Sequence, residues 1–211
     1  MEEKKNRKIV YLINSVQSCK DDVTRLIPAF RKLGYETKMF ENPSSYQSLQ
    51  DELDKLDNRA TIKEAIIICH GYGFPGKCYN DYIYIGNDAL SYQMFVDMFH
   101  PDIHVALFTA HWLKTYNRQK NGPIIPSEYS FTACDHLKLQ INDRSTKGSL
   151  FARYMLQALD DFASSKTDKK IDVKEFYIKV CDPILKKKKR NQYIFSTGVY
   201  RCTDPFYITK L

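Results

Sequence analysis

Two histidines and a cysteine follow short apolar runs of this sequence, and their side chains are types that do chemistry in proteins. They are His70, His111 and Cys134. An imidazole beside a thiolate can act as the general base for a nucleophilic attack. Imidazole and thiolate are also ligands that zinc and other transition metals accept. The residue types alone therefore leave open a thiol–imidazole pair and a metal site.

The apolar runs before these residues have the composition of strands that are buried on both faces. Stretches with amphipathic spacing lie between them and indicate helices. One such helix follows Asp21 and Asp22 and stops at Gly34. The predicted strands are 8–14, 35–40, 64–69, 103–109 and 128–134, with a hairpin arm at 82–85 and late strands at 193–200 and 206–209; the further predicted helices are 46–56, 90–99, 148–163 and 171–180.

Strands that alternate with helices predict a mostly parallel sheet with helices on both faces. In such sheets, ligands bind beyond the carboxyl ends of the strands. We therefore expect His70, His111 and Cys134 at or just past strand ends, along the same edge of the sheet.

The composition is that of a globular protein, with 211 residues, 43% hydrophobic and 27% charged. No run approaches the roughly 20 apolar residues of a membrane helix. The charged segment Met1–Lys8 lacks the apolar core of a signal peptide, and the six cysteines form no CxxC pair. We therefore expect a cytoplasmic protein with reduced thiols and no contact with a membrane.

Part of the net charge of +7 lies in one run, Lys186–Arg190. We interpret this run as a solvated loop before the last strand. Nuclear import and nucleic-acid binding are its alternative interpretations. We do not expect a nucleic-acid partner.

Five short motifs occur along the chain in a fixed order. They are Ser18-Cys19-Lys20-Asp21-Asp22, Ile66-Ile67-Ile68-Cys69-His70-Gly71, Val105–His111, Ser130–Cys134 with Lys147-Gly148-Ser149-Leu150-Phe151, and Lys170-Ile171-Asp172-Val173. The motifs and their order resemble those of the caspase and metacaspase superfamily of cysteine peptidases, from Lys8 to the C-terminus. The resemblance implies an α/β fold with three layers (α/β/α). Its mostly parallel six-stranded sheet would have helices on both faces and an antiparallel edge strand.

The same resemblance implies one domain over residues 1–211. Residues 8–113 would form a half similar to the caspase large subunit, and residues 128–211 a half similar to the small subunit. Residues 114–127 would be the short loop between them, where caspases carry their cleavable linker. This loop contains no Asp, so we expect the chain to stay uncut in maturation.

In the family's mechanism, His70 would be the general base and the N–H of Gly71 would donate to an oxyanion. His111, however, occupies the position of the nucleophilic cysteine. An imidazole there gives no acyl-enzyme route of the same kind, because that chemistry requires a thiolate. We therefore interpret the chain as a pseudo-protease.

The residues that would form the substrate pocket match neither branch of the superfamily completely. Cys19 and Asp22 resemble a metacaspase segment whose aspartate binds basic residues. Thr109 occupies the position of a caspase glutamine, and Arg144 lies near that of a caspase arginine. The substrate class therefore does not follow from the resemblance.

Two alternatives remain for the chemistry. Cys134 would be a displaced nucleophile paired with His70, which would make the chain an active caspase-like endopeptidase. His70, His111 and Cys134 would otherwise bind a transition metal. The leading interpretation requires no cofactor.

The resemblance also implies a mode of association, since caspases pair through their last strand. We expect a homodimer, or a heterodimer with a caspase-fold relative, formed through an edge strand within residues 193–209. A regulatory module of protease signalling, of the cell-death or immune type, would act in this way. A peptide or protein ligand is also compatible with this interpretation.

Overall fold

The computed structural model describes most of the chain. The described residues are 7–15, 20–56, 62–74, 82–99, 103–113, 131–135, 150–186, 192–195, 199–200 and 205–211. Residues 114–130, which include the predicted linker loop, lie outside the described part, as do residues 187–190 of the basic run.

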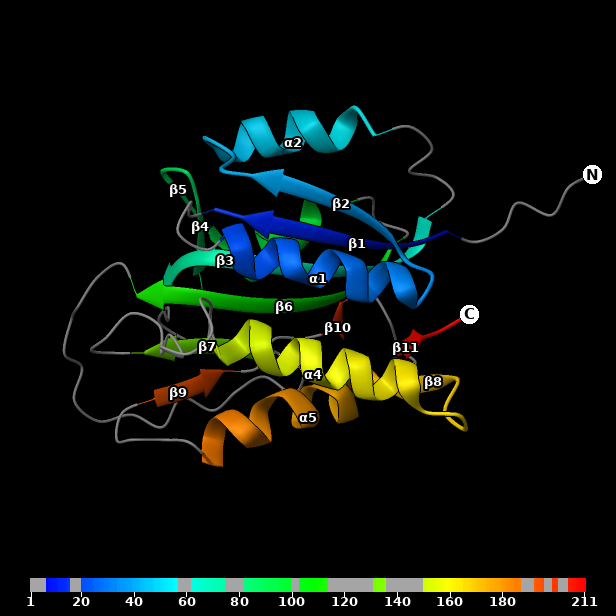
Figure 1. Cartoon of the computed structure of the whole chain (residues 1–211). Helices are drawn as coiled ribbons and strands as arrows, with labels where there is room; N and C mark the ends of the chain where they lie inside the picture. The colour runs from blue at the N-terminus through cyan, green and yellow to red at the C-terminus, as the bar shows by residue number, and fades with distance from the viewer. Residues whose placement is uncertain are drawn as a thin grey trace, which may run out of the picture.

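A six-stranded path forms the centre of the molecule (Figure 1). Its strands, in spatial order, are β2 (Glu36–Glu41), β1 (Arg7–Asn14), β3 (Ile62–Phe74), β6 (His104–Leu113), β7 (Phe131–Asp135) and β9 (Gln192–Phe195). Pairs along the path are parallel as far as β7, and β9 runs antiparallel to β7. The predicted sheet, with its antiparallel edge strand, is confirmed.

The described residues also include five short strands. They are β4 (Tyr82–Ile85), β5 (Asp88–Ser91), β8 (Lys170–Asp172), β10 (Val199–Tyr200) and β11 (Tyr207–Thr209). β4 and β5 form a hairpin that joins the main sheet at the end of β3, and β10 pairs with β6. β8 and β11 form a separate two-stranded sheet.

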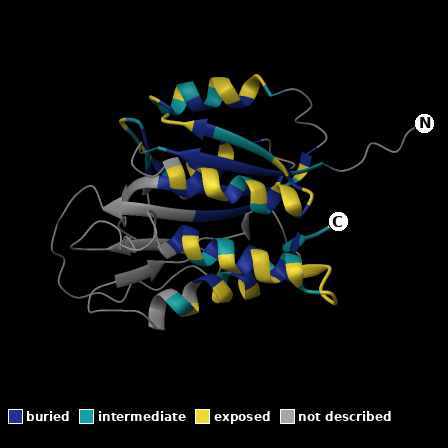
Figure 2. Ribbon diagram, viewed as in Figure 1, coloured by how far each residue is buried: buried dark blue, intermediate teal, exposed yellow. Residues whose placement is uncertain are grey.

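Helices cover both faces of the main sheet. They are α1 (Lys20–Lys32), α4 (Leu150–Ser164) and α5 (Val173–Lys186) on one face, and α2 (Tyr46–Asp54) and α3 (Tyr92–Asp97) on the other. Along α1, α2 and α4, buried residues face the sheet and exposed residues face solvent, as the burial colours show in Figure 2.

Alternation along the strands creates the two cores. Val10 and Leu12 of β1 pack with α1, α4 and α5, whereas Tyr11 and Ile13 pack with α2 and α3. β3 and β6 are divided in the same way, so the central strands are apolar on both faces. Burying one such large side chain contributes about 2 kcal/mol.

Two predicted helices begin later in the structure than the apolar pattern indicated. Leu90 lies in β5 rather than in a helix, and α3 begins after Ser91, whose hydroxyl accepts the N–H of Met94. Ile171 likewise lies in β8, and α5 begins where Asp172 accepts the N–H of Lys174 at 2.8 Å. In both places a capping side chain fixes the start of the helix.

β3 and β6 are longer than predicted. Both apolar runs were expected to end just before or at the histidines, but the pairing continues through Gly73↔Leu113. His70 and His111 therefore lie inside strands and not beyond their ends. β4 extends β3 further by pairing with Gly73 and Phe74, a partner that the apolar run does not reveal.

The last six residues form a strap, residues 206–211, which connects distant parts of the chain. Phe206 and Ile208 are buried in the core beneath α1, α4 and α5. The N–H of Thr209 donates to Tyr35 Oη at 3.0 Å, and Lys210 Nζ donates to the carbonyl of Phe162 at 2.8 Å. The late strand predicted at 206–209 exists, but as β11 in the small sheet and not at the edge of the main sheet.

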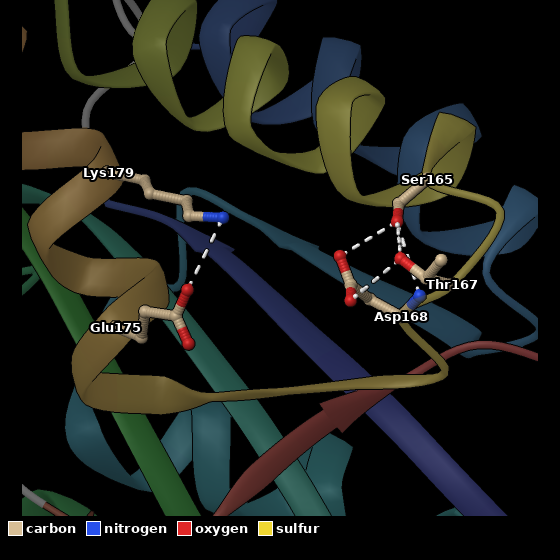
Figure 3. Close-up of polar contacts among 5 residues, drawn as sticks. All are labelled: Ser165, Thr167, Asp168, Glu175 and Lys179. Carbon is tan, nitrogen blue, oxygen red and sulfur yellow. Dashed lines mark hydrogen bonds and ion pairs between the residues drawn. The ribbon is translucent and has the colours of Figure 1, made fainter.

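Side-chain hydrogen bonds close the connection between α4 and β8, as Figure 3 shows. Asp168 accepts from Ser165 Oγ at 2.7 Å and from Thr167 Oγ1 at 3.1 Å. On the neighbouring helix α5, Lys179 pairs with Glu175 at 3.4 Å.

Within the described residues, no helix combines the length and apolar character that crossing a membrane requires.

Candidate functional site

The candidate site lies towards the carboxyl ends of β1, β3 and β6. His70 pairs in register with Asn14 of β1 on one side and with Ala110 of β6 on the other. Ala110 in turn pairs with Ala133 of β7. Gly71, one residue after His70, pairs with His111. The parallel register thus brings together three of the motifs found in the sequence.

His70 is buried, with 2% of its surface exposed, on the face of the sheet that α1 covers. Its Nδ1 lies 3.8 Å from Oδ2 of Asp22, a buried residue in the first turn of α1. Asn14, the neighbour of His70 on β1, is also buried. Asn14 was not among the residues predicted from the sequence, although a polar residue at the end of an apolar strand was a usable signal.

Burial lowers the pKa of His70 to about 4, and the nearby Asp22 carboxylate offsets only part of this effect. The imidazole is therefore neutral at pH 7. A neutral imidazole has one nitrogen that donates a hydrogen bond and one that accepts.

The backbone around His70 is held by β1. The carbonyl of His70 accepts the N–H of Ser15 at 2.9 Å. The carbonyl of Asn14 accepts the N–H of Asn42 at 2.7 Å, which ties the end of β2 to the same place. The strand ends beneath α1 are thus fixed by hydrogen bonds on both sides of β1.

Cys69, the residue before His70, is not placed to act as a nucleophile. Its side chain is buried in the core on the α2 and α3 face of the sheet. Burial raises the pKa of the Cys69 thiol to about 12, so the thiolate is absent at neutral pH. Cys69 is therefore a buried, small residue of the core.

The backbone positions of His111 and Cys134 are described, but their side chains are not. His111 lies beside Gly71 on the neighbouring strand. Cys134 follows Ala133 on β7 and pairs with Tyr193 of β9. It is thus two strands away from His70, about 10 Å between backbones. The nucleophile position of His111, the oxyanion role of Gly71 and the alternative role of Cys134 stay predictions.

The predicted substrate pocket is described only in part. Asp22 is buried beside His70, and the backbone of Thr109 pairs with Cys69. Cys19 and Arg144 lie outside the described residues. No group of three or more metal-binding side chains occurs in the part that the structure describes. That part does not include the side chains of His111 and Cys134, so the alternative metal site stays a prediction.

Comparison with solved structures identifies the architecture. The Drosophila initiator caspase Dronc superposes with a TM-score of 0.60 over 94% of this chain and 82% of its own, at 13% identity. The caspase-1 of Spodoptera frugiperda superposes with a TM-score of 0.56 over 92% of this chain and 87% of its own, also at 13% identity. The chain has the caspase fold.

A third structure, that of pro-sf-caspase-1, superposes with a TM-score of 0.57 over 92% of this chain and 88% of its own, again at 13% identity. No family model and no curated protein match the sequence. At this level of identity the likeness establishes the caspase fold and leaves the activity to be argued from the residues themselves.

Proposed function

We propose that this chain is a non-catalytic caspase-fold module that regulates protease signalling by binding a protein partner in the cytoplasm. One observation carries the proposal: residue 111, which pairs with Gly71 next to His70, is a histidine. The resemblance to caspases puts the nucleophilic cysteine at this position. An imidazole there removes the thiolate on which acyl-enzyme formation depends.

The surroundings of His70 support the same conclusion. A general base in a cysteine peptidase becomes imidazolium when it takes the proton of the thiol. Burial opposes that charge, as the pKa of about 4 for His70 indicates. The adjacent thiol of Cys69 stays protonated because burial raises its pKa to about 12.

Association through the edge strand is the mode of binding that the topology supports. β9 ends the path of the main sheet, and among the described residues no strand pairs with its outer side. Unpaired backbone groups on such an edge are a template for another strand. A second copy of the chain, or a caspase-fold relative, would continue the sheet there. The edge strand was expected within residues 193–209. Val199 lies in that range but does not belong to this edge, since β10 pairs with β6.

The absence of catalysis is tested with the purified chain and a mixed peptide library. We expect no cleavage, and no labelling by a thiol-directed probe at Cys134 that depends on His70. Cleavage that disappears in both Cys134→Ser and His70→Gln would replace the proposal with an active endopeptidase.

Association is tested by sedimentation velocity across micromolar concentrations, alone and with a caspase-fold relative. We expect Phe195→Asp, in β9, to abolish the complex by placing a charge at the paired edge. Thr37→Asp, in β2 at the opposite edge, is the matched control and should leave it intact. A wild type that stays monomeric and binds no relative would contradict this mode of action.

A further inference from the structure

The buried polar residues of the described part gather at one place. They are Asn14, Asp22 and His70, with 1%, 4% and 2% of their surfaces exposed. Asn14 and His70 pair in register, and Asp22 faces His70 from α1. Buried polar groups are costly unless they interact. Their convergence therefore indicates a joint role.

We infer that Asp22 is a positioning residue for His70: its carboxylate selects the imidazole tautomer that carries the proton on Nδ1, so that Nε2 is the acceptor. The distance of 3.8 Å between Nδ1 and Oδ2 is too long for a direct hydrogen bond. The selection is electrostatic. A negative charge favours the ring nitrogen nearest to it as the N–H, and burial leaves that field weakly screened.

Among the described residues next to His70, Asp22 is the group that brings a charge to this ring. On β1 the neighbours are Asn14 and Ser15, and on β6 the paired residue is Ala110. Asp21 precedes Asp22 in α1 but is exposed. The electrostatic contribution to the pKa of His70 likewise comes from Asp22, which raises it against the larger effect of burial.

This role differs from the one that the resemblance to metacaspases gives to Asp22. A carboxylate that selects basic substrates has to reach the substrate, whereas the Asp22 side chain is 5% exposed and turned towards β3. A group that reaches His70 would then meet an acceptor at Nε2. The matching ligand group is a donor such as an N–H, O–H or S–H.

The tautomer is measured at pH 7 by long-range ¹H–¹⁵N correlation on the full chain labelled in its histidines. His70→Gln identifies the signals of His70 among the five histidines. We expect the wild type to show a protonated Nδ1 and an unprotonated Nε2. Asp22→Asn should shift both nitrogens towards values typical of mixed tautomers, because the charge is gone. Asp21→Asn is the matched control and should leave them unchanged.

An Nε2–H tautomer in the wild type would overturn the inference, and so would an unchanged spectrum in Asp22→Asn. The wild-type spectrum decides the tautomer without relying on the folding of a variant. The inference is independent of the proposed function, because the tautomer is read without catalysis or a partner. Peptidase activity would therefore contradict the proposed function without contradicting the tautomer assigned to His70.

Discussion

Burial of His70 couples its protonation to folding. The pKa of His70 falls from 6.5 to about 4 in the folded chain. The unfolded chain therefore takes up the proton first as the pH falls. The stability associated with neutral His70 is complete above about pH 6.5 and is lost between there and pH 4.

We expect the acid sensitivity of the fold to decrease when His70 is replaced. At pH 5 the buried imidazole costs the wild type about 2 kcal/mol of unfolding free energy relative to pH 7. His70→Gln lacks this titration, so its free energy of unfolding should decrease less between pH 7 and pH 5. Urea unfolding of both proteins at pH 7, 6 and 5 measures the difference. If the free energy of unfolding decreased equally in the two proteins, the burial of a neutral His70 would be contradicted.

The thiol of Cys69 should be inert in the folded protein. Its pKa is raised to about 12 by burial, and its side chain lies in the core. We expect iodoacetamide at pH 8 to leave Cys69 unmodified in the native protein and to modify it in urea. Peptide mapping by mass spectrometry measures the labelled fraction. Rapid native labelling of Cys69 would show that this face of the sheet opens.

The sequence was sufficient to find His70, because a buried strand leading into His-Gly is a local signal. The pairing of His70 with Asp22 was not predicted, because it depends on how α1 lies across β3. Asp22 was selected for a different role, from a motif that says nothing about burial. Asn14 was missed because its significance lies in its register with His70 and not in its neighbours along the chain.

At the scale of elements, the turn between β4 and β5 is fixed by close contact with the start of α2. Gly86 has φ +58°, and a Cβ there would lie 1.8 Å from the backbone oxygen of Ser44. Asp88 Oδ2 accepts the N–H of Tyr46 at 2.7 Å, which joins the hairpin to the helix. The hairpin and α2 therefore support each other.

We expect Gly86→Ala to destabilise the chain more than Gly34→Ala. Both glycines have positive φ, which costs an alanine about 1 kcal/mol or more. At Gly86 the added methyl also collides with backbone, so the total should reach about 3 kcal/mol. At Gly34 it meets the flexible side chain of Leu211, which can move away. Thermal and urea unfolding compare the two variants, and equal losses would count against the close approach at Gly86.

Long apolar strands and helices were predictable because each has a period that one sequence window reveals. The short elements were not. Leu90 continues the helical spacing of the residues after it, but pairing with Ile83 places it in β5. β8 and the extension of β3 exist because distant strands, β11 and β4, pair with them, and such partners leave no local pattern.

At the scale of the whole molecule, the mostly parallel sheet, its antiparallel edge strand and the two covered faces followed from the alternation of elements and from the resemblance to caspases. The place of the strap (residues 206–211) did not. Its apolar residues look like a last strand of the main sheet, yet Phe206 and Ile208 complete the core beneath α1, α4 and α5. Only the three-dimensional arrangement of both halves distinguishes these alternatives.

The strap should contribute to global stability. Ile208 is fully buried, and Ile208→Ala should cost about 3 kcal/mol through lost burial and a cavity. Leu211→Ala is the matched control, because Leu211 is 89% exposed and its loss should change stability by less than about 0.5 kcal/mol. Urea unfolding measures both. A small effect of Ile208→Ala would mean that the strap opens independently of the core.

The strap also has a consequence for a chain that has been nicked by a protease between β6 and β7. The later fragment would carry the strap, whose contacts include Tyr35 and the carbonyl of Leu33 in the earlier fragment. The same two fragments share a core through α1 and α4. Gel filtration would then not detect the cut, because the two fragments would elute together until a denaturant separates them.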